Sequence, residues 1–115
     1  FESRVLKGKR LVFRAEAEAD LVALYVHIAQ ASGSFHTAFS FTERLLSACF
    51  KLVDFPDRGA PRDDIKAALR ILSIERRTVV TYFVKGDEVI ISNILHGGRD
   101  WEAFFLDDKI DDGEG

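Results

Sequence analysis

The stretch TVVTYFVKGDEVIISNIL, residues 78–95, decides the fold of this chain. Its first part, Thr78–Val84, is rich in β-branched and aromatic residues, which favour strands. Residues 85–87, Lys-Gly-Asp, supply a tight turn, and Glu88–Leu95 continues as a second strand. That second strand is apolar at both sets of alternating positions, which is typical of a strand buried on both faces. The stretch therefore predicts a β-hairpin whose second strand lies inside a sheet.

Two helices are predicted upstream of this hairpin. After a short β-type run at Arg10–Arg14, Ala17, Leu21, Leu24 and Ile28 recur at helical spacing. The serine-glycine-serine sequence at 32–34 ends this first helix and caps a second one, and so short a connection predicts an antiparallel helical hairpin. The broad apolar face predicted for the second helix contains Phe35, Ala38, Phe39, Leu45, Leu46, Cys49, Leu52 and Val53.

The remaining segments complete one sheet and add a last helix. Both prolines break the helical pattern within Phe55–Pro61, and Leu69–Leu72 resumes as a strand. A turn at His96–Arg99 leads to a final helix predicted over Asp100–Leu106. The order β-α-α-β-β-β-α predicts an α+β two-layer domain, with a helical hairpin packed on a mainly antiparallel sheet.

The chain has 115 residues and 47% hydrophobic positions, which suits one folded domain. We expect this domain to span residues 10–106, after a poorly patterned N-terminal extension at 1–9. Residues 107–115 hold five acidic side chains and one lysine, so we expect a mobile acidic tail. Without the tail, the formal charge changes from −3 to about +1, with 15 basic and 14 acidic residues. So weak a charge is no strong nucleic-acid signature.

Several function classes lose support. No apolar run approaches the roughly 20 residues that span a bilayer, and no secretory signal pattern is present, so we expect a cytoplasmic protein. Cys49 has no partner cysteine and is predicted to be inert core filling. His27 and His36 lack partners at ligand spacing, and Gly97-Gly98 lacks the fuller glycine pattern of a phosphate loop. We therefore predict no metal and no cofactor.

One set of polar residues lies on or near the three late strands: Arg70, Arg77, Tyr82, His96, Arg99 and Asp100. In the predicted sheet these residues could gather at one end. Two guanidinium groups with an imidazole and a phenol would serve phosphate binding and proton transfer in RNA cleavage. The alternative is structural: Arg99 pairs with an acid, Tyr82 packs, and His96 caps a strand end.

Five segments together resemble the RelE/ParE toxin superfamily over about residues 10–106. They are Glu16–Leu21, Phe55–Asp64, Leu69-Arg70, Arg77 leading into the strand with Tyr82, and Ile94–Trp101. The Phe-Pro-x-x-Gly turn and the Leu-His-Gly-x-Arg-Asp ending are most similar to the ParE branch.

This resemblance implies the toxin half of a bacterial type II toxin–antitoxin pair. ParE-like toxins bind DNA gyrase and trap its cleaved-DNA intermediate without turnover chemistry, whereas RelE-like relatives cut mRNA in the ribosome. Both are neutralised by an antitoxin, usually ParD for ParE, so the resemblance implies a hetero-oligomer that reaches operator DNA only through the antitoxin. It also implies a helical hairpin over a mainly antiparallel sheet, with the first strand beside the last.

Functional positions carry over where the motifs match: Arg70, Arg77, Tyr82, His96, Arg99, Asp100 and Trp101. Trp101 is predicted to pack the last helix on the sheet. Arg70 and Arg77 could instead receive acidic side chains of the antitoxin.

The choice of branch rests on charge and chemistry. A ribosome-bound nuclease benefits from a basic surface and needs a base and an acid, and only Glu75 offers a weak carboxylate partner here. We therefore predict a gyrase inhibitor that is not an enzyme. The alternatives are a ribosome-dependent endoribonuclease using His96, Arg70, Arg77 and Tyr82, or a non-toxic relative that only binds antitoxin.

The first helix carries a second apolar strip at Val22, Ala23, Val26 and Ala29. Either the helix is unusually buried, or the strip, with Val22 and Val26 as its candidate contacts, is covered by the antitoxin or a second toxin chain. The acidic tail is predicted to be solvated, the alternative being a contact with gyrase.

Overall fold

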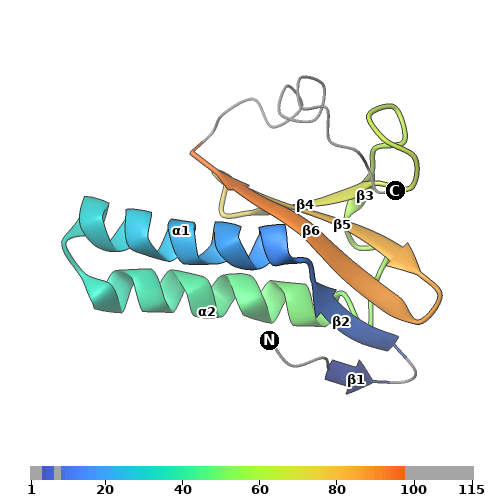
Figure 1. Ribbon diagram of the computed structural model, residues 1–115, viewed down its shortest axis with the longest axis horizontal. Helices are drawn as coiled ribbons and strands as arrows, with labels where there is room; N and C mark the ends of the chain where they lie inside the picture. Colours follow the sequence, from blue (N-terminus) through green and yellow to red (C-terminus); the bar gives the residue numbers. More distant parts are fainter. Residues whose placement is uncertain (1–3, 7–8, 98–115) are drawn as a thin grey trace.

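The computed structural model describes residues 4–6 and 9–97 (Figure 1). Two helices, α1 (Ala15–Ser32) and α2 (Phe35–Lys51), run antiparallel across one face of a sheet. The described strands are β1 (Arg4–Leu6), β2 (Lys9–Phe13), β3 (Ala60–Pro61), β4 (Arg70–Ile74), β5 (Thr78–Lys85) and β6 (Glu88–His96). They form one sheet in the order β1-β2-β6-β5-β4-β3. The predicted α+β two-layer architecture is confirmed.

The β5–β6 hairpin is the centre of the sheet. The two strands pair antiparallel from Lys85↔Glu88 to Thr78↔His96. Strand β2 pairs parallel with the other edge of β6, in the register Arg10↔Glu88 to Phe13↔Ile91. Strand β6 therefore lies in the sheet interior, as its two apolar faces predicted, and the first predicted strand lies beside the last.

The helical hairpin forms through the predicted capping. Gly33 adopts the left-handed conformation at φ 71°, and its N–H donates to the carbonyl of Ala29. The Ser34 hydroxyl then accepts a hydrogen bond from the N–H of Thr37 at 3.1 Å, which starts α2. Because two residues both stop one helix and cap the next, the helices must run antiparallel.

The core lies between the helices and the sheet. Its fully buried side chains come from both layers, among them Leu11, Ala17, Leu45, Cys49, Leu52, Val80, Tyr82, Val89 and Ile91. Burial raises the pKa of Cys49 to about 12, so its thiol stays protonated at neutral pH. This environment agrees with the inert role predicted for the cysteine.

A β-bulge at Ser92 changes which residues of β6 face the helices. Ile91 pairs with Tyr82, but the next pair is Asn93↔Thr81, so Ser92 has no partner on β5. Side chains alternate along a strand, and one extra residue reverses the alternation. Ile91 and Ile94 therefore both belong to the core. The bulge also puts His96 on the helix side of the sheet, where its ring meets rings of α1 and α2.

Two short strands were not expected from the sequence. Strand β1 lies within the extension predicted to be poorly patterned, and it pairs antiparallel with β2. Strand β3 adds two residues to β4 after the proline-rich break. Both are edge strands, and three or two residues are too few to show an alternating pattern. The predicted helix at 100–106 and the tail at 107–115 lie outside the described residues.

The second helix buries a narrower face than predicted. Its buried side chains are Ala38, Phe41, Leu45 and Cys49, whereas Phe35 and Phe39 are 74% and 55% exposed. Both phenylalanines belong to the predicted apolar face but lie outside the core, because Phe35 is the first residue of the helix, ahead of the buried row, and Phe39 lies beside that row. Neither described helix is long and apolar enough to cross a membrane.

Candidate functional site

The four described members of the predicted polar set, Arg70, Arg77, Tyr82 and His96, lie in two separate groups. Arg70 pairs with Tyr82 across β4 and β5, whereas Thr78 pairs with His96 across β5 and β6. Tyr82 and Thr78 are four residues apart on β5, about 13 Å at the rise of a strand. Arg77 precedes Thr78 and belongs to the second group. The expectation of a single cluster is therefore wrong.

The other three carried-over positions, Arg99, Asp100 and Trp101, lie outside the described residues. Their predicted roles stay predictions.

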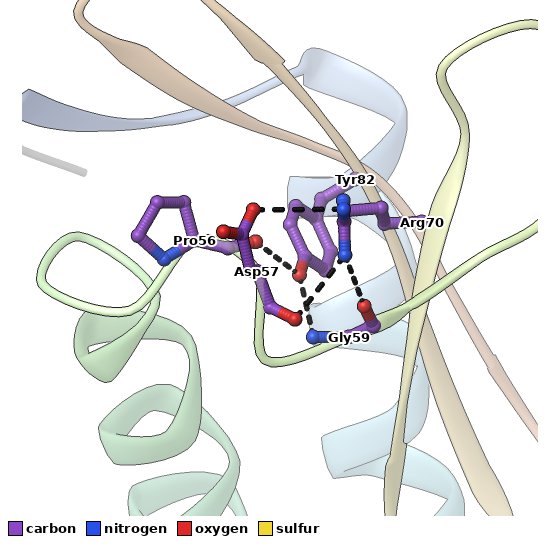
Figure 2. A network of polar contacts seen from close by, with 5 residues as sticks. All are labelled: Pro56, Asp57, Gly59, Arg70 and Tyr82. Atoms are coloured by element: carbon purple, nitrogen blue, oxygen red, sulfur yellow. Dashed lines mark hydrogen bonds and ion pairs between the residues drawn. The ribbon is translucent and has the colours of Figure 1, made fainter.

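In the first group, the Tyr82 side chain binds the backbone of the loop that follows α2 (Figure 2). The side chain is fully buried, and its hydroxyl donates to the carbonyl of Pro56 at 2.7 Å. The same hydroxyl accepts from the N–H of Gly59 at 2.8 Å. Burial raises the pKa of Tyr82, so the phenol stays protonated and keeps both hydrogen bonds.

Arg70 binds the same loop from β4 (Figure 2). Its Nη1 donates to the carbonyl of Gly59 at 2.5 Å and to that of Asp57 at 3.2 Å. Its Nη2 lies 3.5 Å from Oδ1 of Asp57. The guanidinium fork therefore contacts both backbone and side chain of one short segment.

Gly59 lies so close to the sheet that only glycine fits. A Cβ built there would lie 2.6 Å from the carbonyl oxygen of Ile71 and 2.6 Å from the Tyr82 ring. We call residues 54–59 the anchored loop. Arg70 and Tyr82 serve to hold it, so the structural interpretation of Tyr82 is the one the geometry supports.

The outer side of the anchored loop is open. The Phe55 side chain is 63% exposed. Residues 54–58, Asp-Phe-Pro-Asp-Arg, line a pocket of about 550 Å³. The two prolines and the glycine predicted a break in the helical pattern here, but no sequence pattern indicated that Phe55 is exposed.

The second group surrounds His96. Its Nδ1 lies 2.5 Å from the Thr78 hydroxyl, and its ring stands edge-on to His27 at 5.8 Å and to Phe41 at 6.1 Å between centroids. Burial, followed by the charges of His27 and Arg77, lowers the pKa of His96. The imidazole therefore favours the neutral form more than a solvated histidine does.

Both histidines line a pocket of about 320 Å³ between α1 and the end of β6, together with Asp20. The Asp20 carboxylate accepts from the N–H of Ile94 at 2.9 Å and from Nδ2 of Asn93 at 3.2 Å. It thus satisfies a backbone donor of β6 beyond the point where β2 ends. No cluster of three or more potential metal ligands occurs in the part of the chain that the structure describes.

The remaining members of the predicted chemistry are also engaged. Arg77 Nη2 donates to the carbonyl of Gly97 at 3.2 Å. Glu75 is the weak candidate for a catalytic carboxylate. Its Oε2 accepts from Nε of Arg44 at 2.5 Å, and its Oε1 accepts from Nη2 of Arg44 at 3.1 Å. The Arg44 guanidinium lowers the pKa of Glu75. A carboxylate held in its charged form by an arginine is a poor proton donor.

The second apolar strip of α1 is mostly exposed. Val22 is 64% and Val26 is 46% exposed, and Ala23 is exposed as well, whereas Ala29 is buried. The interpretation that an unusually buried helix accommodates the whole strip is therefore wrong. Two exposed valines one helical turn apart form an apolar surface on α1, which we call the α1 strip.

The architecture defines the class of this protein before any comparison. A helical hairpin lies on one face of a mainly antiparallel sheet, and β2 runs parallel to β6 beside it. This is the arrangement expected of the RelE/ParE superfamily of small toxins.

A comparison with protein families makes the assignment more specific. The family described as "ParE toxin of type II toxin-antitoxin system, parDE" matches residues 11–101. The chain belongs to this ParE toxin family. None of the curated proteins matches the sequence significantly.

Two solved structures are similar. One is described as "Chromosomal ParDE TA system from P. aeruginosa", with 28% identity and a TM-score of 0.66, covering 75% of this chain and 92% of that one. The other is the solution structure of protein HP0894 from Helicobacter pylori, with 13% identity and a TM-score of 0.41, covering 77% and 94%.

Proposed function

We propose that this ParE-family chain inhibits DNA gyrase by trapping its cleaved-DNA intermediate, and that a ParD-like antitoxin neutralises it. The family match over residues 11–101 supports the toxin role, and the similar Pseudomonas structure is described as a ParDE system. The inhibition needs binding energy and no turnover chemistry of the toxin itself. We infer that the chain acts in the cytoplasm, where gyrase is found, and reaches operator DNA only through the antitoxin.

One observation carries the choice of gyrase over mRNA. RNA cleavage needs a base, an acid and phosphate-binding groups that converge on one phosphodiester. Of the four residues considered for that role, Arg70 and Tyr82 hold the anchored loop, about 13 Å along β5 from the level of His96. The groups that would have to act together therefore do not converge.

The α1 strip is the surface that we assign to the antitoxin. An amphipathic helix or other apolar segment can bury Val22 and Val26, which are exposed on a regular helix face. Antitoxin segments that fold on binding would gain most from such an extended surface. The alternative occupant is a second toxin chain, which would make the isolated toxin a dimer. The molar mass of the isolated toxin in solution distinguishes the two.

The deciding experiment adds the purified chain to two systems. In a supercoiling reaction with purified bacterial gyrase, we expect linear plasmid to accumulate. The linear form becomes visible after the bound gyrase is denatured with detergent and digested with protease. In a reconstituted translation system, we expect the mRNA to stay intact.

Cuts in the mRNA at codon positions, lost when His96 is replaced by alanine, would overturn the proposal in favour of an endoribonuclease. No effect in either system would indicate a relative that only binds antitoxin. The control in both systems is the toxin premixed with a ParD-like antitoxin that binds it, which should restore normal supercoiling.

A further inference from the structure

The anchored loop has its backbone fixed on both sides of an exposed aromatic ring. The Phe55 N–H donates to the carbonyl of Lys51 at 3.0 Å, and the Phe55 carbonyl accepts from the N–H of Arg58 at 3.0 Å. The next carbonyl, that of Pro56, accepts from the buried Tyr82 hydroxyl. The ring nevertheless stays 63% exposed. The backbone of the loop is thus held at several points, while its largest apolar side chain is mostly exposed.

The contacts that hold the anchored loop order its backbone in the absence of a partner. Clamping a short segment with a buried tyrosine, an arginine fork and a glycine that tolerates no Cβ orders the backbone before any binding. A pre-ordered loop loses little conformational entropy on association, so the burial of its aromatic ring is converted efficiently into affinity. Exposed aromatic rings on rigid supports are the usual anchors of protein interfaces.

The charges around the ring indicate the chemistry of the partner. Asp54 and Asp57 flank the Phe55–Pro56 tip, and both carry exposed side chains, that of Asp57 being 91% exposed. Arg58 is the cation at the far side of the tip. Asp57 already lies 3.5 Å from Arg70, so a complementary partner offers an apolar cavity for the ring with a basic group at its rim facing Asp54.

The position of the loop separates it from the α1 strip. Helix α2 begins beside the Gly33 turn and ends at Lys51, so its 17 residues carry the chain about 25 Å away from that turn. The anchored loop follows directly at this far end. The α1 strip lies on the other helix, 7 to 11 residues before the turn. The α1 strip and the anchored loop are thus separate exposed apolar features, in addition to the exposed Phe35 and Phe39 of α2, and the proposed function requires two partners.

We propose that the anchored loop is the docking element for the target enzyme, with Phe55 inserted into an apolar cavity of gyrase, while the antitoxin binds the α1 strip. This inference rests on the proposed function and adds the residue that makes the contact. The rigid tip suits a folded enzyme with a preformed cavity, whereas the regular face of α1 suits a segment that folds on binding.

The test compares Phe55→Ala with Phe35→Ala, which removes a ring of similar exposure (74%) from a site outside both surfaces. Wild type and both variants are assayed for gyrase-trapped plasmid, for antitoxin affinity and for thermal unfolding. We expect Phe55→Ala to need at least about tenfold more protein for the same trapped plasmid, which is the effect of losing about 1.4 kcal/mol of binding. Its antitoxin affinity and unfolding midpoint should match wild type, and Phe35→Ala should behave as wild type against gyrase.

The outcomes distinguish docking through Phe55 from the inhibition of gyrase by the chain as a whole. If wild type traps plasmid and Phe55→Ala does so equally well, the docking inference is wrong and the proposed function stands. If Phe55→Ala loses gyrase and antitoxin binding alike while folded, the loop is a shared surface and the assignment to the target alone is overturned. If wild type does not affect gyrase, the proposed function fails, and with it the assignment of gyrase as the partner of the loop.

Discussion

The hydroxyl group of Tyr82 holds the anchored loop at two backbone positions. It both donates to Pro56 and accepts from Gly59, and the residue itself has no exposed surface. Removing this one oxygen leaves two backbone groups of a half-buried loop without their partner. The cost follows from desolvated polar groups and not from lost packing, because the ring stays in place.

We therefore predict that Tyr82→Phe lowers the free energy of unfolding by about 1–3 kcal/mol, the usual cost of an unpaired buried polar group. Urea unfolding followed by circular dichroism measures it. Tyr25→Phe, at a half-buried tyrosine of α1, is the matched control and should change stability by much less. An equal loss of unfolding free energy in both variants would contradict the role of the Tyr82 hydroxyl in holding the loop.

Gly59→Ala tests the same contact from the other side. The added methyl would meet the Ile71 carbonyl and the Tyr82 ring at 2.6 Å, so the loop must move and weaken the Tyr82 hydrogen bonds. We expect a loss of about 1–3 kcal/mol from this overpacking. The double variant with Tyr82→Phe should lose less than the sum of the two, because both changes break one contact. Strict additivity in urea unfolding would show that they act independently.

His96 gives a pH dependence whose sign follows from its surroundings. Burial, His27 and Arg77 lower its pKa from the ordinary 6.5, so the unfolded chain binds the proton more readily than the folded chain. The contribution of His96 to stability is therefore complete above pH 6.5 and is lost as the pH falls from there through the lowered folded value. We predict that the His96 ring protons titrate in proton NMR with a midpoint below the ordinary 6.5. A midpoint at or above 6.5 would contradict this environment.

The roles of these residues show where sequence reasoning stops. The composition of 78–95 was enough to predict that Tyr82 lies on a strand, because strand preference is local. Its function as a clamp was not predictable, because its partners Pro56 and Gly59 are 26 and 23 residues away in the chain. The same holds for Glu75, whose binding to Arg44 spans 31 residues.

At the scale of elements, periodicity predicted the helices and the central hairpin, and it failed where the pattern is short or mixed. The helical spacing of Leu21 and Leu24 is a local signal that survives in the structure. The bulge at Ser92 left no such signal, because β6 is apolar on both sides of it. Phe35 and Phe39 share the spacing of core residues but lie beside the buried row, and only the position of the neighbouring helix decides between the two.

The α1 strip carries the element-scale prediction. We expect the double variant Val22→Glu/Val26→Glu to bind the antitoxin at least about tenfold more weakly, since charged side chains would have to be desolvated in the interface. Both positions are exposed on a helix, and glutamate is a good helix former, so the unfolding midpoint should stay close to that of wild type. Isothermal titration calorimetry with a ParD-like antitoxin measures the affinity. Ser47→Glu, at an exposed position of α2 away from the α1 strip, is the control, and an unchanged affinity in the double variant would remove the strip from the interface.

The whole molecule is small and carries little net charge. With a body of about +1 outside the acidic residues 107–115, long-range attraction to nucleic acid is weak. Local apolar contacts are then the main source of affinity for proteins, and the described residues offer them on the α1 strip, on the anchored loop and at Phe35 and Phe39 of α2. The separation of the α1 strip from the anchored loop affects how an antitoxin can neutralise the toxin. An antitoxin that covers only α1 has to block gyrase by bulk or by its further contacts, since it leaves Phe55 itself uncovered.

Loss of the α1 contact should therefore produce a toxin that its antitoxin no longer controls. We predict that Val22→Glu/Val26→Glu traps gyrase on plasmid as wild type does but needs at least about tenfold more antitoxin for relief, in proportion to its weaker binding. The measurement is a supercoiling reaction at fixed toxin with increasing antitoxin, and the control Ser47→Glu should be relieved at the wild-type ratio. Because Phe55 and the contacts of Tyr82 and Arg70 are unchanged in the variant, the toxin keeps the loop that we propose to dock on gyrase. Relief at the wild-type ratio would mean that the antitoxin neutralises through another surface, and loss of trapping by the variant alone would mean that α1 belongs to the gyrase contact.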